Sequence, residues 1–376
     1  MSTVRMLVKG IVPFVFVCSV LLVSPAVAGE PPRYTITEIG PLPGEEDAQA
    51  FGINEAGDVV GFSSTTIGFP DCCLTTGTAF LFSDGELSDL GPLNGLDTRA
   101  EAINNLGQVA GWADEAFPRA FLWQNGEIQD IGTLGGHPFS KAFDINDAGQ
   151  VVGWSYPPDT NDRHIFLWQD GAMLDLGFVS NTGPPEFGIN NLGQVVGGGF
   201  IWEDGVRTTI AMRAYDINDL SQVVGYGVGG AVLWENGTFQ QLGGSVAYAI
   251  NNRSQVVGVA DGASLWHDGV MHTLSDLVTL PPDWLLRSAW DINDTGQIVG
   301  NASTPDGITH AFLMTPVDAD FDDDDDTDLM DFAAFRSCLT GPGVLRSSEC
   351  RLRDIDRDGH VDLKDFQALQ WVFTGP

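Results

Sequence analysis

The sequence contains few cysteines and few basic residues. Its 376 residues include five Cys and 17 Lys and Arg, against 51 Asp and Glu, so the formal net charge is −34 at pH 7. Nucleic acids and anionic membrane surfaces bind basic patches, and this composition excludes both as partners. Cations are the natural ligands instead. The four cysteines downstream of the leader are too few for a disulfide scaffold, although pairs of them can act as staples: Cys72, Cys73, Cys338 and Cys350.

Long apolar runs are absent beyond the N-terminus. Residues 1–28 are typical of a secretory signal peptide: Arg5 and Lys9 give a basic start, 11–23 is almost unbroken in its apolar character, and Ala26-Val27-Ala28 forms a small-residue cleavage site. The apolar run is too short to favour a membrane-spanning helix. The sequence therefore predicts a secreted or cell-surface protein that begins near Gly29 and has no membrane span after cleavage.

Familiar catalytic motifs are also absent. The sequence has no Gly-x-Ser-x-Gly elbow, no His-Glu-x-x-His and no phosphate-binding loop, so no catalytic residue and no organic cofactor is predicted. Pairs of carboxylates for glycoside chemistry remain possible, but sequence alone cannot place two of them at a working separation. Trp284, beside Pro281-Pro282-Asp283, is the aromatic residue best suited by its context to stack on a sugar.

What the sequence has in abundance is a repeat. The stretch Ile145-Asn146-Asp147-Ala148-Gly149-Gln150-Val151-Val152-Gly153 is one of seven copies, spaced 28 to 50 residues apart. A period near 40 residues is typical of solenoids and propellers. The asparagines of the Ile-Asn pair mark the seven copies: Asn54, Asn104, Asn146, Asn190, Asn218, Asn251 and Asn293.

Each repeat contains four short segments rich in β-branched and aromatic residues, which predicts strands. Segments one and two are joined by Asn-x-x-Gly-Gln, with Ser221 and Ser254 replacing the glycine in two copies. Segments three and four are joined by Trp-x-Asp-Gly or Trp-x-Asn-Gly, a strong hairpin signal. Each unit is therefore expected to be a four-stranded antiparallel meander, the size of one propeller blade.

The ends of the repeat region predict a closed ring. Residues 34–40 match a fourth segment and precede the first Ile-Asn, whereas the pattern after 311–314 stops one strand short. An N-terminal strand that fills this gap would remove the exposed strand edges of an open array. The expected fold of residues 29–317 is thus all-β, a seven-bladed β-propeller. An open β-solenoid is the alternative, and it would need end caps.

The meander also predicts where a ligand binds. Both tight turns of each blade emerge on one face, and the longer, variable connections emerge on the other, such as 63–77, 156–163, 180–185 and 275–287. Variable loops on a rigid scaffold are how binding faces are built, so we expect any ligand, including a glycan, on the variable face.

The repeats resemble the secreted HAF-repeat family, named for a His-Ala-Phe signature. His310-Ala311-Phe312 matches it fully, and His164-Ile165-Phe166 and Arg119-Ala120-Phe121 match in part. The resemblance covers about residues 34–317 and implies no catalytic residue.

Residues 318–376 follow a different pattern, with two Asp-rich loops that each precede an apolar, helix-like run and a Thr-Gly-Pro. The spacing of oxygen-bearing residues is that of EF-hand calcium loops, so we expect two Ca²⁺ sites. In the first loop Asp325 occupies the position of the usual glycine, which predicts that the second site is tighter. The predicted ligands are Asp320, Asp322, Asp324, Asp326, Asp328 and Asp331 in the first loop, and Asp354, Asp356, Asp358, His360, Asp362 and Asp365 in the second.

These duplicated loops, with Asp at the last ligand position and a helix after each, resemble a dockerin type I module. The resemblance implies a small α-helical EF-hand-type domain over 318–376 and a cohesin-like or cell-surface protein partner. Cys338 and Cys350 flank the segment that connects the two halves and can form a disulfide.

Two functions fit these features. The first is an exported calcium-binding protein whose propeller is a binding scaffold and whose dockerin-like tail attaches it to a protein or a surface. The alternative is a polysaccharide-degrading hydrolase or lyase carried by the same tail, and this idea rests on analogy. A cluster of carboxyl groups with raised pKa values at the ring centre would favour the enzyme.

Overall fold

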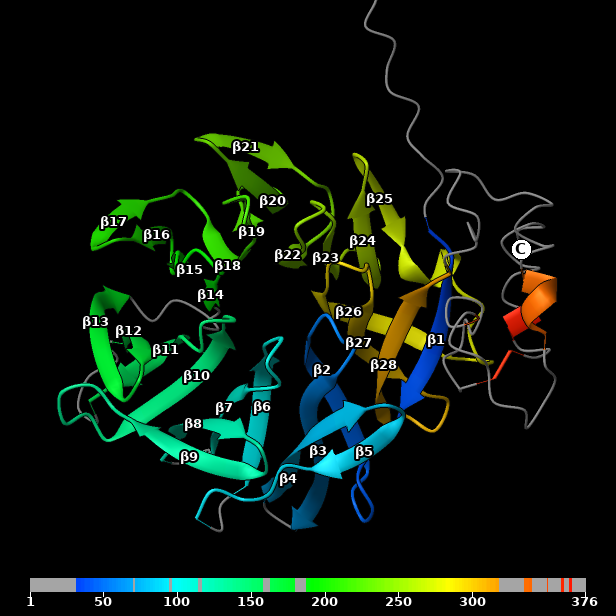
Figure 1. The fold of residues 1–376 in the computed structure, drawn as a ribbon, viewed down its shortest axis with the longest axis horizontal. Coiled ribbons are helices and arrows are strands. Elements are labelled where there is room, and N and C mark those ends of the chain that lie inside the picture. The colour runs from blue at the N-terminus through cyan, green and yellow to red at the C-terminus, as the bar shows by residue number, and fades with distance from the viewer. Residues whose placement is uncertain are drawn as a thin grey trace, which may run out of the picture.

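The computed structural model describes residues 32–69, 72–94, 97–113, 117–157, 163–179, 187–317, 335–339, 350, 360–361 and 365–366. Over the repeats it consists of seven four-stranded antiparallel sheets arranged as a ring (Figure 1). The prediction of a seven-bladed β-propeller is confirmed, and the solenoid alternative is wrong. Within the described residues no helix is long and apolar enough to cross a membrane.

We number the blades in chain order, each from its innermost strand outward. Blade 1 contains β2 (Asp47–Ile53), β3 (Val59–Phe69), β4 (Cys72–Ser83) and β5 (Glu86–Asp89); blade 2 contains β6 (Thr98–Ile103), β7 (Val109–Ala113), β8 (Arg119–Gln124) and β9 (Glu127–Gly132). Blade 3 contains β10 (Phe139–Ile145), β11 (Val151–Tyr156), β12 (Arg163–Gln169) and β13 (Ala172–Val179); blade 4 contains β14 (Phe187–Ile189), β15 (Val195–Gly197), β16 (Phe200–Glu203) and β17 (Val206–Thr209). Blade 5 contains β18 (Arg213–Ile217), β19 (Val223–Gly227), β20 (Gly230–Glu235) and β21 (Thr238–Gln241); blade 6 contains β22 (Val246–Ile250), β23 (Val256–Val259), β24 (Ala263–His267) and β25 (Val270–Thr273), followed by the 3₁₀ turn η1 (Leu274–Asp276). Blade 7 contains β26 (Leu285–Ile292), β27 (Ile298–Ser303), β28 (Thr309–Pro316) and the N-terminal β1 (Tyr34–Ile39).

The N-terminal strand closes the ring as the sequence predicts. β1 pairs antiparallel with β28, from Tyr34 opposite Pro316 to Ile39 opposite Ala311, and so supplies the outer strand of blade 7 (Figure 1). Tyr34 is buried in the core that blade 7 shares with blade 6. Because the two ends of the propeller sequence hold one blade together, no edge strand is left open between the first and last blades.

The hairpin turns between the third and fourth strands have the expected geometry. At each Asp-Gly or Asn-Gly both residues have positive φ, for example 53° at Asn125 and 85° at Gly126, which defines a type I′ turn. Ser221 and Ser254, which replace glycine in the other tight turn, also have positive φ, 61° and 60°. Their hydroxyl groups donate to Gln194 and Gln222 of the preceding blades, and these bonds compensate for the left-handed backbone.

The Phe of the His-Ala-Phe signature is explained by the glycine opposite it. Phe312 is fully buried and pairs with Gly300 on the neighbouring strand. A Cβ on Gly300 would lie 2.1 Å from the Ser288 carbonyl oxygen and 2.5 Å from the Phe312 ring. The glycine leaves the space that the ring fills. Equivalent Gly–Phe pairs occur in four other blades: Gly61–Phe80, Gly111–Phe121, Gly153–Phe166 and Gly197–Phe200.

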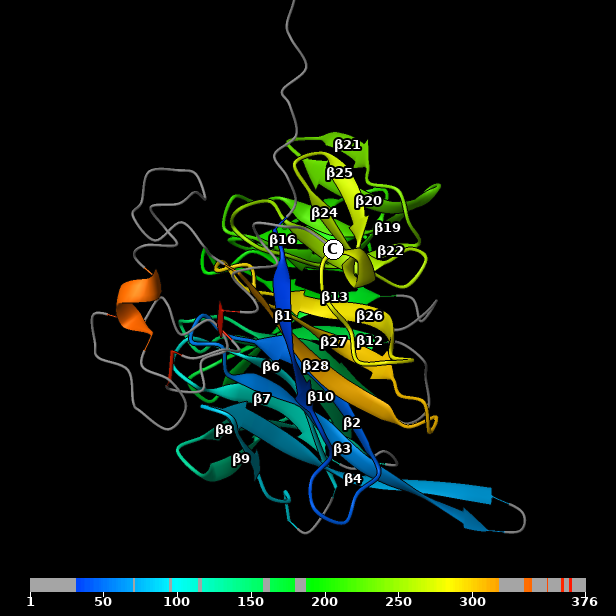
Figure 2. The ribbon, with the colours of Figure 1, turned by 90° about the vertical axis from the view of Figure 1, so that its right-hand side faces the viewer.

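The two faces of the ring differ as predicted, with one correction. The tight turns after the seven Ile-Asn pairs lie on one face and the longer connections on the other. The stretch 63–77, however, is no irregular loop: β3 and β4 continue pairing as far as Phe69 and Cys72. Figure 2 shows this hairpin projecting beyond the ring. β-branched residues such as Thr65, Thr66 and Ile67 favour strand structure and extend the ladder where a loop was expected.

The described part of the C-terminal region is small. Residues 335–338 are helical, and the rings of Phe335 and Phe366 lie 6.3 Å apart. Cys338 and Cys350 form the disulfide that the sequence allows.

Candidate functional site at the centre of the ring

The repeated asparagines form a closed hydrogen-bond ring around the axis. The side-chain Nδ2 of each donates to the backbone carbonyl oxygen of the asparagine in the next blade, at 2.9 to 3.3 Å, and Asn293 donates to Asn54. In six of the seven the Oδ1 accepts backbone N–H groups two and four residues later, as for Asn218 with Leu220 and Gln222. Asn293 Oδ1 accepts from the Thr295 hydroxyl and the Gln297 N–H instead. Each asparagine is only 4% exposed. The repeated asparagine therefore supplies the hydrogen bonds that join neighbouring blades.

A second ring lies directly beside the first, on the tight-turn face. The residue after each asparagine donates its backbone N–H to the side-chain oxygen of its counterpart in the next blade, at 2.6 to 2.9 Å. These residues line a shallow depression of about 180 Å³. Burial raises the pKa of Glu55, and the hydrogen bond from the Asp294 backbone N–H offsets part of that shift. The members are Glu55, Asn105, Asp147, Asn191, Asp219, Asn252 and Asp294.

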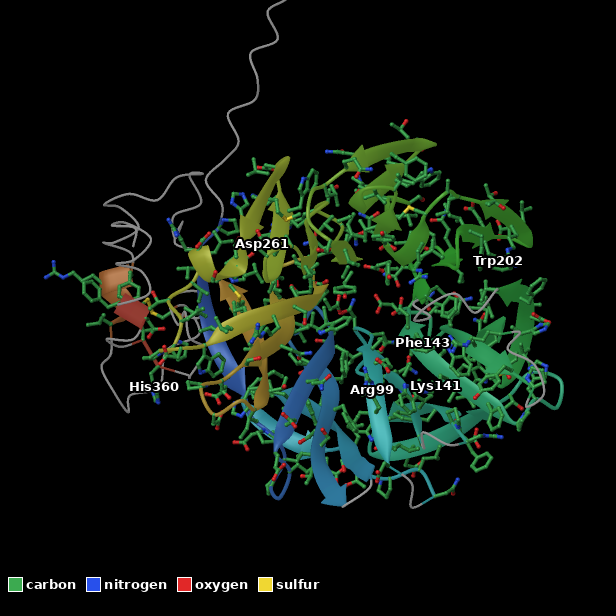
Figure 3. The ribbon with its side chains drawn as sticks, turned by 180° about the vertical axis from the view of Figure 1, so that it is seen from behind. Arg99, Lys141, Phe143, Trp202, Asp261 and His360 are labelled. Carbon is green, nitrogen blue, oxygen red and sulfur yellow. A yellow bond between two sulfur atoms is a disulfide. The ribbon has the colours of Figure 1, made fainter. Side chains whose placement is uncertain are left out.

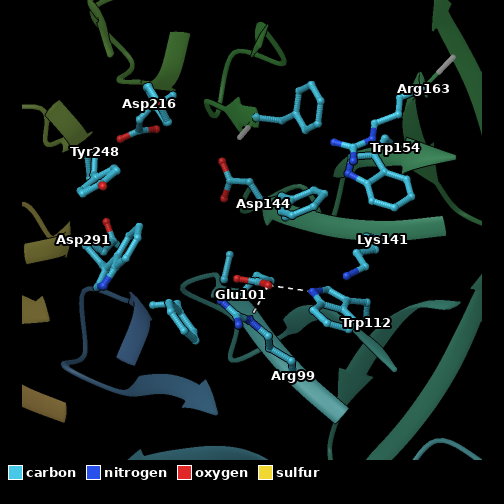
Figure 4. Close-up of a pocket in the computed structure, with 17 residues that line it drawn as sticks. Arg99, Glu101, Trp112, Lys141, Asp144, Trp154, Arg163, Asp216, Tyr248 and Asp291 are labelled. Atoms are coloured by element: carbon cyan, nitrogen blue, oxygen red, sulfur yellow. Dashed lines mark hydrogen bonds and ion pairs between the residues drawn. The ribbon is translucent and has the colours of Figure 1, made fainter. Parts of the chain in front are cut away.

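The larger cavity, of about 490 Å³, lies in the channel toward the face with the variable connections (Figure 4). A register shift near the end of most innermost strands, for example between Ala142 and Asp144, leaves one residue bulged. In six blades the residue at this position is aromatic and lines the cavity, and in blade 2 it is Glu101. Bulges commonly redirect a side chain in this way. The six aromatic residues are Phe51, Phe143, Phe187, Tyr215, Tyr248 and Trp290.

One wall of the cavity is cationic. Arg99, Lys141 and Arg163 come from β6, β10 and β12, and Figure 4 shows them on the side opposite Tyr248. Lys141 Nζ lies 3.1 Å from the centroid of the Trp112 ring, and the Arg163 guanidinium lies 4.9 Å from that of Trp154. Such cation–π contacts hold the cationic groups against the aromatic rings.

Arg99 pairs with a carboxylate that lines the same cavity. Its Nε lies 2.8 Å from Glu101 Oε1, which also accepts a 2.7 Å hydrogen bond from Trp112 Nε1. The guanidinium also lies 4.1 Å from the centroid of Phe51. Glu101 thus fixes both Arg99 and Trp112 in the wall of the cavity.

Two other indole groups of the cavity differ from Trp112. Within the described part of the chain, Nε1 of Trp154 and Nε1 of Trp290 are buried and make no hydrogen bond. Trp154 is only 4% exposed. A buried donor without an acceptor costs about 1–3 kcal/mol. Two such donors in the wall of one cavity point to a missing acceptor.

Three buried aspartates lie among the residues that line the cavity: Asp144, Asp216 and Asp291. Both oxygens of each carboxyl accept backbone N–H groups, one from the next residue and one from a neighbouring blade, as Asp291 does from Ile292 and Ile53. Burial raises the pKa of Asp216 to about 6 and that of Asp291 to about 7, and Asp216 adds to the shift at Asp291. Burial, then Asp216, raises the pKa of Asp144.

Several residues singled out from the sequence lie elsewhere. Trp284 is 9% exposed and packs in the core of blades 6 and 7, so the expectation that it stacks on a sugar is wrong. His164 pairs with Asp175 at 2.9 Å and His310 with Glu38. The tryptophans of the repeated hairpin motif pack against the hydrophobic clusters between blades: Trp123, Trp168, Trp202, Trp234 and Trp266.

Of the predicted calcium ligands, His360 and Asp365 are described, and Asp365 is fully buried. Among the described residues no group of three or more His, Cys, Asp or Glu side chains is arranged to hold a metal ion. Ten predicted ligands lie outside the described residues: Asp320, Asp322, Asp324, Asp326, Asp328, Asp331, Asp354, Asp356, Asp358 and Asp362.

The sequence analysis did not identify the residues that line the cavity. The signal was present in the sequence: the residue three positions before the repeated asparagine is aromatic in six repeats and is Glu101 in blade 2. Position in the repeat gives the direction of a side chain only once the bulge is known.

Comparisons with known proteins show the fold alone. No protein-family model matches the chain, and no curated protein matches it. The similar solved structures include a gluconolactonase, XC5397 from Xanthomonas campestris, at 8% identity and a TM-score of 0.41, over 77% of this chain and 98% of that one. YCF48 from Cyanidioschyzon merolae is similar at 12% identity and a TM-score of 0.44, over 75% and 98%. TolB from Acinetobacter baumannii is similar at 9% identity and a TM-score of 0.35, over 75% and 97%.

Proposed function

We propose that this chain is an exported binding protein whose ligand occupies the central cavity of the propeller. The observation that carries the proposal is the convergence, in a cavity of about 490 Å³, of aromatic faces, three cationic side chains and two indole N–H donors without acceptors. A volume of this size is in the range of small-molecule sites. The cavity lies toward the variable connections, where loops can adjust access from blade to blade.

Filling the cavity tests this proposal. Ala102 lines it and occupies the position that aspartate takes in three other blades, so a larger side chain there projects into the same space. Ala102→Phe should abolish binding of any ligand found by screening the full chain against a glycan and metabolite panel, whereas Ala102→Ser should bind normally. Equal binding by both variants, with unchanged melting temperatures, would refute a ligand site in the cavity.

The second half of the proposal is that the tail binds two Ca²⁺ ions and docks the propeller to a cohesin-like or cell-surface protein. The duplicated Asp-rich loops, with oxygen-bearing residues at the spacing of calcium loops, support it. The contact of Phe335 with Phe366 brings the two post-loop segments together, as paired calcium loops require.

Calorimetric titration of the full chain with CaCl₂ tests the tail. Two binding events are expected, and Asp354→Ala with Asp356→Ala should remove the tighter one. The exposed pair Asp170→Ala and Asp204→Ala in propeller hairpins provides a charge-matched control with both events retained. A single event, or none, would overturn the two-site assignment.

A polysaccharide hydrolase or lyase remains the second candidate, because Asp291, with its pKa raised to about 7, lines the cavity where a general acid would be needed. Both oxygens of that carboxyl already accept backbone N–H groups, which favours a role in joining blades. Turnover of any polysaccharide by the wild type, lost in Asp291→Asn while binding persists, would establish the enzyme.

A further inference from the structure

Three of the nine lysines and arginines in residues 32–317 line the cavity. The chain carries a net charge of −34, and residues 32–317 contain one lysine and eight arginines. That lysine and two of the arginines form the cationic wall: Lys141, Arg99 and Arg163. Four carboxyl groups line the same cavity, but Glu101 is paired with Arg99, and both oxygens of Asp144, Asp216 and Asp291 accept backbone N–H groups. An anionic ligand would therefore meet positive charge on the side of Arg163 and Lys141.

The cavity also has two uncharged hydrogen-bond donors, which, like the cations, favour a ligand with oxygen acceptors. Trp154 Nε1 and Trp290 Nε1 can only donate, so a ligand must offer them oxygen acceptors. Arg163 packs on the same Trp154, which places a charge next to a free N–H (Figure 4). An anionic oxygen that accepts from both would satisfy the donor and pair with the cation, and such charge-assisted bonds are strong.

The opposite wall offers flat apolar surface. Tyr248 and Trp290 stack with their ring centroids 4.3 Å apart, and Tyr215 packs edge-on against Tyr248 at 5.8 Å. A ligand that spans the cavity therefore meets aromatic faces on one side and cations on the other. A ligand whose ring presents C–H groups on its face and an acidic group at its edge would complement both walls.

We propose that the cavity binds a saccharide that carries an anionic group, with the acid against Arg163, Lys141 and Trp154 and the sugar ring against Tyr248 and Trp290. The inference rests on the proposed function, because it identifies the ligand class of the same cavity. The acidic group can be the carboxylate of a uronic acid or a sulfate ester.

Calorimetry on the full chain tests the proposal with three probes: trigalacturonate, a sulfated galactose trimer and neutral galactotriose. Either or both anionic probes should bind, and galactotriose should bind at least tenfold more weakly. Arg163→Gln and Trp154→Phe should each weaken the anionic probe tenfold or more. Matched controls outside the cavity are Arg119→Gln, which loses an exposed pair with Asp130, and Trp202→Phe on the third strand of blade 4 (Figure 3).

A comparison of trigalacturonate with the sulfated trimer shows whether the cavity binds a carboxylate or a sulfate ester. Equal binding of galactotriose and the acidic trimers, or binding that Arg163→Gln leaves unchanged, would overturn the inference. If none of the three probes binds, the inference also fails. The proposed function survives each of these failures if another ligand binds the wild type and not Ala102→Phe, so the two proposals are separable.

Discussion

The asparagine ring makes a quantitative prediction about stability. Asn218 Oδ1 accepts from the N–H groups of Leu220 and Gln222, at 3.1 and 2.9 Å, and Nδ2 donates to Gln222 Oε1 and the Asn251 carbonyl, at 2.7 and 2.9 Å. Asn218→Ala removes all four bonds at a site that is only 4% exposed. Each buried group left without a partner costs about 1–3 kcal/mol. Water can reach part of the vacated space, so we expect a loss of about 3 kcal/mol.

The assay is denaturant unfolding followed by tryptophan fluorescence, with the midpoint and slope compared with those of the wild type. Leu220→Ala is the control, because its side chain is 56% exposed in the same turn and should change the free energy of unfolding by no more than about 0.5 kcal/mol. If Asn218→Ala also falls within about 0.5 kcal/mol of the wild type, the ring of asparagines does not hold the blades together, and the physical reading of the repeat is wrong.

Two further predictions concern the interior of the ring. The folded-state pKa values of Asp216 and Asp291, about 6 and 7, are raised above the ordinary 3.8, so the stability that these carboxyls contribute is full below about pH 4 and is lost as the pH rises through 6 and 7. The double variant Asp216→Asn and Asp291→Asn should therefore show a shallower decline of unfolding free energy over this range, and parallel curves would contradict the assignment. Gly300→Ala should destabilise the protein by about 3 kcal/mol or more, because its Cβ would lie 2.1 Å from a backbone oxygen, whereas Gly40→Ala, with nothing within 4 Å, should be neutral in thermal unfolding. Equal melting temperatures for the two glycine variants would refute the packing account of the Gly–Phe pairs.

The architecture was predictable from sequence because each blade repeats local signals. The Asn-Gly and Asp-Gly turns, the Val-Val-Gly strands and the missing final strand are all readable without tertiary contacts. The number of blades and the closure by residues 34–39 follow from them.

The site was less predictable because it depends on relations between blades. The sequence shows that Asn218 can bond its own turn, but the bond to Asn251 exists only once the blades are side by side. In the same way, Arg99, Lys141 and Arg163 are 22 to 64 residues apart on three different strands and come together only at the cavity. The prediction that Trp284 stacks on a sugar was wrong because its neighbouring prolines indicate an exposed loop, whereas the Trp284 side chain packs in the core.

The central claim, that a ligand occupies the cavity beside Trp154, is tested most directly by NMR of the tryptophan indole N–H groups in ¹⁵N-labelled full-length protein. The resonance of Trp154 is assigned by its absence in Trp154→Phe, and that of Trp202 by its absence in Trp202→Phe. Titration with trigalacturonate should shift the Trp154 signal, because its N–H gains an acceptor, and leave the Trp202 signal in place. Saturable binding that moves Trp202 and leaves Trp154 unchanged would place the ligand outside the cavity and contradict the account.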